Sequence, residues 1–106
     1  MVDAKLLEKI DINDGFLMYK NTENGILLDV RHTDEFSSGH IDGSINIPLE
    51  EIEDIIKVIL DFETPLFVYC RSGVRSTKAT EVLYNIGYKN VKNIGGILDY
   101  KGIIVK

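Results

Sequence analysis

The sequence predicts an α/β fold in which a mostly parallel sheet is covered by helices. Short apolar runs over residues 26–30 and 66–69 lack polar alternation, as is typical of strands buried on both faces. Segments with helical spacing of apolar residues, such as 52–59 and 79–86, lie between such runs. Strands that alternate with helices in this way predict parallel strands joined by right-handed crossovers.

The expected strands are bounded by turn residues and by local changes in polarity. Alternation of apolar and polar residues predicts a short edge strand at residues 10–12. Asn24-Gly25 forms a turn before the central strand, and Pro48 stops the strand that follows it. In chain order, we expect strands over residues 10–12, 26–30, 44–47, 66–69 and 91–94.

The expected helices have apolar faces or recognisable ends. Asn13-Asp14 caps the helix that runs to residue 20, and Thr33 caps a short helix that Gly39 ends. Gly87 ends the helix whose apolar face is predicted over residues 79–86. We expect helices over residues 13–20, 33–38, 52–59 and 79–86, a further one within residues 3–9, and a helical turn near Tyr100.

Length and composition narrow the class of protein. The 106 residues fit one domain over 1–106, and a hydrophobic content of 44% supports a real core. A net charge of −5 argues against nucleic acid as the main partner. One cysteine excludes an intramolecular disulfide, and no cluster has zinc-ligand spacing, so we expect no metal and no cofactor. Without a signal peptide or an apolar run of membrane-spanning length, we expect a soluble cytoplasmic protein with no membrane partner.

The segment around Cys70 carries the strongest functional signal. An apolar strand ends at this thiol, a short loop with Gly73 and two arginines follows, and a helix then begins. A thiol placed under loop amides and facing a helix N-terminus is biased toward the thiolate. No acidic residue lies between Glu63 and Glu81, so the charge of this segment is positive. A lone buried cysteine is more often a small hydrophobe, but that reading leaves the arginines and the glycine unexplained.

Four stretches together resemble the rhodanese family. They are Leu27-Leu28-Asp29-Val30-Arg31; Glu35-Phe36 with Gly39-His40-Ile41 and Gly43-Ser44-Ile45-Asn46-Ile47-Pro48; Val68 to Ser76; and Ile94-Gly95-Gly96-Ile97. They follow the family order over roughly residues 8–102. The resemblance implies a central, mostly parallel five-stranded sheet with helices on both faces, and transfer of a sulfane sulfur.

The resemblance also implies a mechanism and a set of site residues. The Cys70 thiolate attacks the outer sulfur of a donor such as thiosulfate, and a persulfide forms. Cyanide in an assay, or a thiol or protein in the cell, then takes that sulfur. The loop N–H groups are expected to stabilise negative charge on sulfur. The loop residues assigned to binding are Arg71, Ser72, Gly73, Val74, Arg75 and Ser76.

The charged residues near the loop allow different roles. Arg71 is expected to recruit the anionic donor, because a guanidinium fork suits thiosulfate oxygens. Arg75 either does the same or pairs internally with Asp29. Asp29 and Arg31 are expected to be structural or to support the site from behind, as an ion pair that orders the neighbouring loop. His40 is expected to be structural rather than a partner of the thiol.

Two other functions remain open at this point. Cysteine phosphatases and arsenate reductases also use a thiolate under loop amides, but with a Cys-x5-Arg loop, whereas Cys70 and Arg75 make Cys-x4-Arg. The shorter ring suits a sulfur atom better than a phosphoryl group. The second alternative is a persulfide carrier or binding module fed by a cysteine desulfurase. One departure from the family is Tyr100, which lies where a tryptophan is common.

Overall fold

The computed structural model describes residues 8–106 and has a parallel sheet between two layers of helices. The elements are α1 (Ile12–Lys20), β1 (Ile26–Asp29), α2 (Thr33–Ser38), β2 (His40–Ile41), β3 (Ile45–Asn46), the 3₁₀ helix η2 (Leu49–Lys57), β4 (Leu66–Cys70), α3 (Val74–Ile86), β5 (Val91–Gly96), the 3₁₀ helix η3 (Ile97–Asp99) and β6 (Ile104–Val105). The main sheet has the order β3-β1-β4-β5 with all neighbours parallel. The α/β prediction is therefore confirmed.

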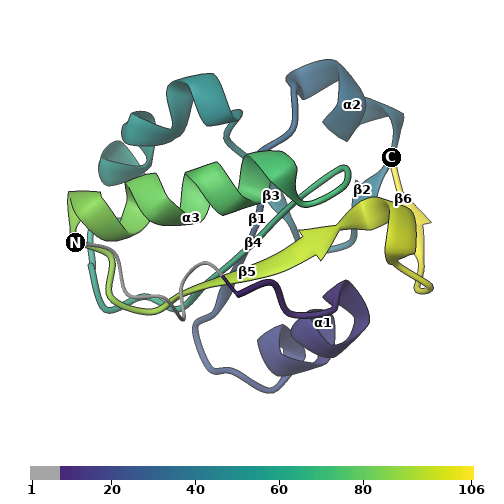
Figure 1. Cartoon of the computed structure of the whole chain (residues 1–106), viewed down its shortest axis with the longest axis horizontal. Coiled ribbons are helices and arrows are strands. Elements are labelled where there is room, and N and C mark those ends of the chain that lie inside the picture. Colours follow the sequence, from purple (N-terminus) through teal and green to yellow (C-terminus); the bar gives the residue numbers. More distant parts are fainter. Residues whose placement is uncertain (1–7) are drawn as a thin grey trace.

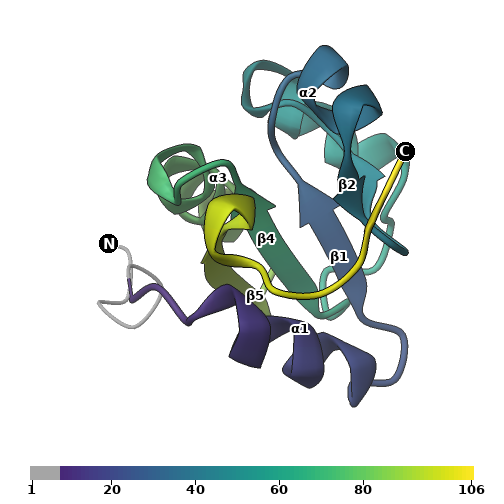
Figure 2. The same ribbon diagram turned by 90° about the vertical axis from the view of Figure 1, so that its right-hand side faces the viewer.

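The sheet separates two hydrophobic cores (Figure 1; Figure 2). Helices α3 and η2 cover one face, and α1 covers the other. Alternate residues of β4 point to opposite faces, as the pleat of a strand requires. Val68 and Cys70 belong to the core under α3, whereas Phe67 and Tyr69 belong to the core above α1. Cys70 thus ends the central strand on the α3 side.

The main sheet of the described chain has four strands instead of the predicted five, and the difference lies at the edge formed by β5. Lys9 adds one isolated parallel bridge to Asn93 where a fifth strand was expected. The strand predicted at residues 10–12 is wrong, because α1 already begins at Ile12. The N-cap of α1 is Asp11, whose carboxylate accepts from the N–H groups of Asn13 and Asp14. The sequence had predicted Asn13 and Asp14 as the cap. The helix expected within residues 3–9 falls almost wholly outside the described residues.

Two helix predictions need correction. The residue before α2 that acts as N-cap is His32, not Thr33, although Gly39 ends the helix as predicted. The helix predicted over 52–59 is instead the 3₁₀ helix η2, which runs over Leu49–Lys57 and has an irregular residue at Glu51. Its tighter turn aligns residues three apart, so Ile52 and Ile55 are buried. Ile56, which an α-helical stripe would bury, is 47% exposed.

A second, two-stranded sheet was not predicted. Strands β2 and β6 pair antiparallel, with His40 opposite Val105 and Ile41 opposite Ile104. Each strand has only two residues, too few for a recognisable period. This pairing places β6 beside β2 and α2, near the carboxyl ends of β1 and β4 (Figure 2).

Candidate active site

Cys70 lies at the carboxyl end of β4, where ligands commonly bind in open parallel sheets. The chain turns sharply after it and enters α3 at Val74. Gly73 makes this turn with φ of +104°, a backbone conformation that favours glycine. The cysteine side chain is 1% exposed, so its sulfur is covered by the loop.

Two backbone N–H groups of the loop and helix point at the Cys70 sulfur. The Gly73 N–H donates to Sγ at 3.0 Å, and the Ser76 N–H donates at 3.3 Å. The thiol in turn donates to the Ser76 hydroxyl at 3.6 Å. Backbone donors fixed in this way stabilise negative charge that develops on sulfur. The predicted convergence of N–H groups is therefore present at Gly73 and Ser76 of the loop segment.

A buried asparagine holds the start of α3 against β5, and the sequence analysis missed it. The Asn93 carbonyl oxygen accepts from the Ser76 hydroxyl at 2.7 Å and from the Gly95 N–H at 3.0 Å. Its amide nitrogen donates to the Thr77 hydroxyl at 3.0 Å. Asn93 is 1% exposed, and a polar residue on the same face of the strand as Val91 was the available signal.

The paired glycines after β5 let the loop pack closely against the sheet. A Cβ on Gly96 would lie 2.4 Å from the carbonyl oxygen of Arg71 and 2.6 Å from the Cα of Ser72. The Leu98 N–H also donates to the Arg71 carbonyl at 3.2 Å. The backbone at the beginning of the loop is therefore fixed, while the side chains of Arg71 and Ser72 are exposed.

Arg75 makes an ion pair that the sequence did not predict. Its guanidinium binds Glu35 of α2 with both forks, at 2.6 Å and 2.9 Å. The pairing with Asp29 considered above is wrong, because Glu35 occupies the guanidinium. The hydrogen bonds from Arg75 lower the pKa of Glu35 to about 2, so its carboxylate is charged at neutral pH. Glu35 lies 40 residues before Arg75, and no local signal connects them.

Asp29 and Arg31 form a buried pair at the end of β1. The guanidinium donates to Asp29 at 2.7 Å and to the carbonyl oxygen of Gly39 at 2.6 Å. The Arg31 N–H also donates to Asp29 at 2.8 Å. Burial lowers the pKa of Arg31, but the hydrogen bonds and charge of Asp29 outweigh it, so that pKa lies above its usual value. The pair fixes the chain between β1 and β2 beside the site.

The two histidines make contacts of structural kind. His40 stacks on Phe36 with ring centroids 3.7 Å apart, and its Nδ1 lies 2.8 Å from the Phe36 carbonyl oxygen. This geometry supports the structural role predicted for His40. The His32 side chain is 57% exposed and lies near Glu35 and Glu50.

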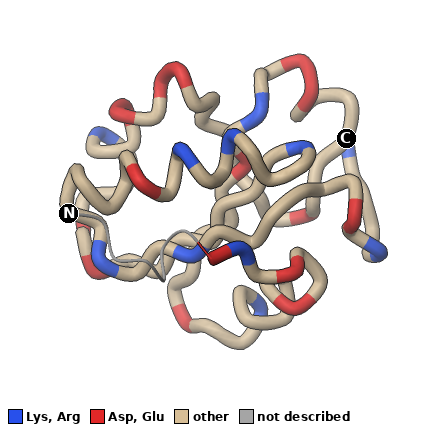
Figure 3. The backbone as a smooth tube through the Cα atoms, viewed as in Figure 1, with Lys and Arg blue, Asp and Glu red and all other residues tan. Residues whose placement is uncertain are grey.

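Positive and negative side chains lie on different elements around the loop (Figure 3). Basic residues follow one another along the loop and the first half of α3, whereas η2 beside it carries acidic residues. Among residues 8–106, no group of three or more His, Cys, Asp and Glu side chains is arranged to hold a metal ion. Within the same residues, no helix is long and apolar enough to cross a bilayer.

Comparisons with known proteins give consistent results. A model of the rhodanese-like domain matches residues 15–102. The thiosulfate sulfurtransferase PspE of Escherichia coli is 38% identical over 73 residues, which is 68% of this chain and 70% of that protein. A mitochondrial relative from Schizosaccharomyces pombe is 42% identical over 83 residues, 67% of this chain but only 58% of its own length. The solved structure of a rhodanese with anions from E. coli superposes with a TM-score of 0.72 at 37% identity, over 77% of this chain and 98% of that one.

Proposed function

Since this chain belongs to the rhodanese-like domain family, we propose that it is a sulfurtransferase acting through a persulfide on Cys70. The observation that carries the proposal is the arrangement at the sulfur, where two backbone N–H groups donate to the thiol of the one cysteine in the chain. The donor is thiosulfate or a similar small anion with a sulfane sulfur. The acceptor is cyanide in an assay and a thiol or protein in the cell.

The reaction proceeds in two displacements at sulfur. The Cys70 thiolate attacks the outer sulfur of thiosulfate, the S–S bond of the donor breaks, and sulfite leaves with the bonding electron pair. The outer sulfur remains on Cys70 as a persulfide. A nucleophilic acceptor then attacks that outer sulfur and the Cys70 thiolate is regenerated, so cyanide becomes thiocyanate. The enzyme ends each cycle unchanged and needs no added oxidant or reductant.

The loop contributes differently to binding and to chemistry. The N–H groups of Gly73 and Ser76 stabilise the charge on Sγ while the S–S bond is made and broken. Arg71 recruits the anionic donor, because it directly follows Cys70 in the chain and its side chain is exposed. Arg75 orders the site by binding Glu35 rather than by contacting the donor.

Formation of thiocyanate from thiosulfate and cyanide tests the proposed activity. Wild type is expected to form thiocyanate, and Cys70→Ser is expected to form none. An aryl phosphate provides the comparison for phosphatase chemistry, which we expect to be negligible because Arg75 is held by Glu35. Turnover of the aryl phosphate that depends on Cys70, without thiocyanate formation, would replace the proposal with a phosphatase function.

A role as persulfide carrier is the second candidate, and apolar side chains at the loop favour it. Val74 is 76% exposed and Leu98 is 61% exposed, and the Leu98 N–H binds the loop backbone. Exposed apolar residues beside a reactive sulfur suit contact with a protein donor such as a cysteine desulfurase. Val74→Asp is expected to slow sulfur uptake from such a desulfurase far more than uptake from thiosulfate. Equal effects on both donors would remove the carrier role.

A further inference from the structure

Lys9 reaches the catalytic loop from a segment that the family model does not match. Its backbone bridges Asn93 of β5, and the next N–H, that of Ile10, donates to the Asn93 carbonyl oxygen at 2.8 Å. These contacts fix Lys9 beside the strand that leads to Gly95 and Gly96. The backbone of Lys9 is therefore placed by the sheet edge rather than by the loop.

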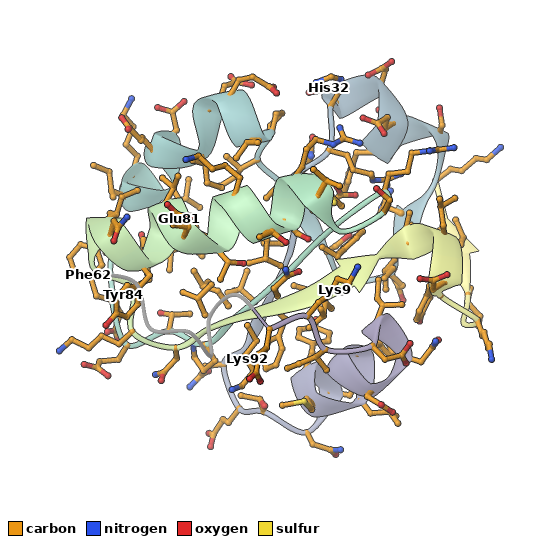
Figure 4. The ribbon with its side chains drawn as sticks, in the orientation of Figure 1. Lys9, His32, Phe62, Glu81, Tyr84 and Lys92 are labelled. Carbon is orange, nitrogen blue, oxygen red and sulfur yellow. The ribbon has the colours of Figure 1, made fainter. Side chains whose placement is uncertain are left out.

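The Lys9 side chain passes over β5 and ends against Gly73. A Cβ on Gly95 would lie 3.4 Å from both Cγ and Cδ of Lys9. A Cβ on Gly73 would lie 2.8 Å from Cδ and 3.0 Å from the ammonium nitrogen. Figure 4 shows the side chain in front of β5, directed along the strand. The ammonium therefore lies close to Gly73, the residue whose N–H donates to the Cys70 sulfur.

The charge of Lys9 matters because two of the other cations near the site, Arg75 and Arg31, are compensated by carboxylates. Glu35 holds Arg75 with both carboxylate oxygens, and Asp29 holds Arg31. The whole chain has a net charge of −5, which opposes the approach of a dianion such as thiosulfate. The ammonium of Lys9 lies within one Debye length, about 8–10 Å, of the sulfur in ordinary buffers. Its field is only partly screened by the loop between them.

We propose that Lys9 is a specificity-determining residue that gives the Cys70 site its preference for anionic reagents. The inference rests on the proposed function for the identity of the natural reagent, an anionic sulfane donor. Lys9 acts by its charge through the loop, and no covalent step passes through it. Arg71 supplies a second positive charge on the exposed side of the loop.

Alkylation of Cys70 measures this preference without any sulfur transfer. Iodoacetate and iodoacetamide have nearly the same size and differ by one negative charge, and Cys70 is the only thiol they can modify. The second-order rate constant with iodoacetate, divided by that with iodoacetamide, reports the electrostatic potential at the sulfur. In Lys9→Met, which keeps an aliphatic chain over the two glycines, we expect this ratio to fall about threefold to tenfold in dilute buffer. Salt near 0.5 M is expected to remove most of the difference.

Lys92→Met is the matched control. Lys92 is exposed on β5, the strand that Lys9 bridges, and its side chain points to the face of the sheet opposite to that of its neighbour Asn93. Figure 4 shows its side chain well away from that of Lys9. We expect the ratio in this variant to stay within twofold of wild type, and Lys9→Arg to retain the wild-type ratio. The thiosulfate KM should rise in Lys9→Met while kcat stays nearly constant.

The outcomes separate this inference from the proposed activity. An alkylation ratio unchanged in Lys9→Met, or lowered equally in Lys92→Met, would overturn the role of Lys9. Thermal unfolding shows whether Lys9→Met is folded. If it is not, Lys9→Arg decides, and loss of the wild-type alkylation ratio in Lys9→Arg would also overturn the role of Lys9. A lowered ratio in a protein that forms no persulfide with thiosulfate would support the local role of Lys9 and reject the sulfurtransferase.

Discussion

The Ser76 hydroxyl lies 2.7 Å from the side-chain carbonyl oxygen of Asn93, so β5 holds the first turn of α3 beside the Cys70 sulfur. Ser76 also offers its N–H to that sulfur at 3.3 Å. The position of one donor to the sulfur therefore depends on a residue that follows it by 17 positions in the chain.

Replacement of Asn93 is expected to weaken both the fold and the reaction. Asn93→Ala removes the acceptor for Ser76 and the donor to Thr77 in a fully buried place. We expect the free energy of unfolding to fall by about 1–3 kcal/mol, as is typical when buried polar groups lose their partners. Urea unfolding measures this loss. Thiocyanate formation at a temperature where the variant is folded should show a lower kcat, and an unchanged kcat would mean that the Ser76 N–H needs no support.

The Glu35–Arg75 pair predicts a specific pH dependence of stability. Because the folded-state pKa of Glu35 is about 2 and its ordinary value is near 4.5, the pair stabilises the fold fully above about pH 5. This contribution is lost as the pH falls from there through 2. We expect Glu35→Gln to be less stable than wild type at pH 7 by about 1 kcal/mol.

The difference between the two proteins should shrink toward zero as the pH falls to 2. Denaturant unfolding of both proteins at a series of pH values checks it. Lys89 and Glu63 form an exposed ion pair away from the site, so Glu63→Gln is the control and should change little at any pH. A constant difference between Glu35→Gln and wild type across the series would contradict the assigned pair.

A methyl group at Gly96 is expected to displace the loop. In Gly96→Ala the new Cβ would collide with the Arg71 carbonyl and the Ser72 backbone, which cannot move without shifting the loop. We expect a loss of about 1–3 kcal/mol in unfolding free energy and a large loss of thiocyanate formation. Gly25→Ala is the control, since its Cβ would meet Phe67 at 3.2 Å, away from the loop. Equal activity in the two variants would show that the close approach at Gly96 is unimportant.

Arg71 is expected to act in binding more than in chemistry. Its side chain is exposed, and no hydrogen bond of its guanidinium is found within residues 8–106. Arg71→Ala should therefore raise the KM for thiosulfate more than it lowers kcat, as expected when ground-state binding is lost. Steady-state kinetics with thiosulfate at saturating cyanide gives both constants. A fall in kcat with an unchanged KM would place Arg71 in the transition state instead.

Much of the fold was predictable because its signals are local. Residues 26–30 and 66–69 are short, largely apolar runs typical of buried strands, and the glycines at 39 and 87 end helices as predicted. The 3₁₀ form of η2 was not predictable, since Ile52 and Ile55 lie three residues apart, a spacing that fits both an α-helix and a 3₁₀ helix. The pairing of β2 with β6 joins segments too short to carry a period.

The sequence predicted the part of the candidate site that is formed by residues close to one another in the chain. Cys70, Gly73 and Ser76 lie within one loop, and the structure brings them together as the motif suggests. Glu35 and Asn93 reach the loop from distant elements, and only the folded chain shows these contacts. The roles assigned to Ser72 and Val74, and the cytoplasmic setting, stay predictions.

The mass of the intact protein after reaction with thiosulfate tests the central claim most directly. Wild type is expected to gain one sulfur, about 32 Da, as a persulfide on Cys70, and to lose it when cyanide is added. Cys70→Ser should gain nothing under the same conditions. An adduct on both proteins, or no adduct on wild type with thiosulfate, would contradict a thiosulfate-dependent persulfide at Cys70.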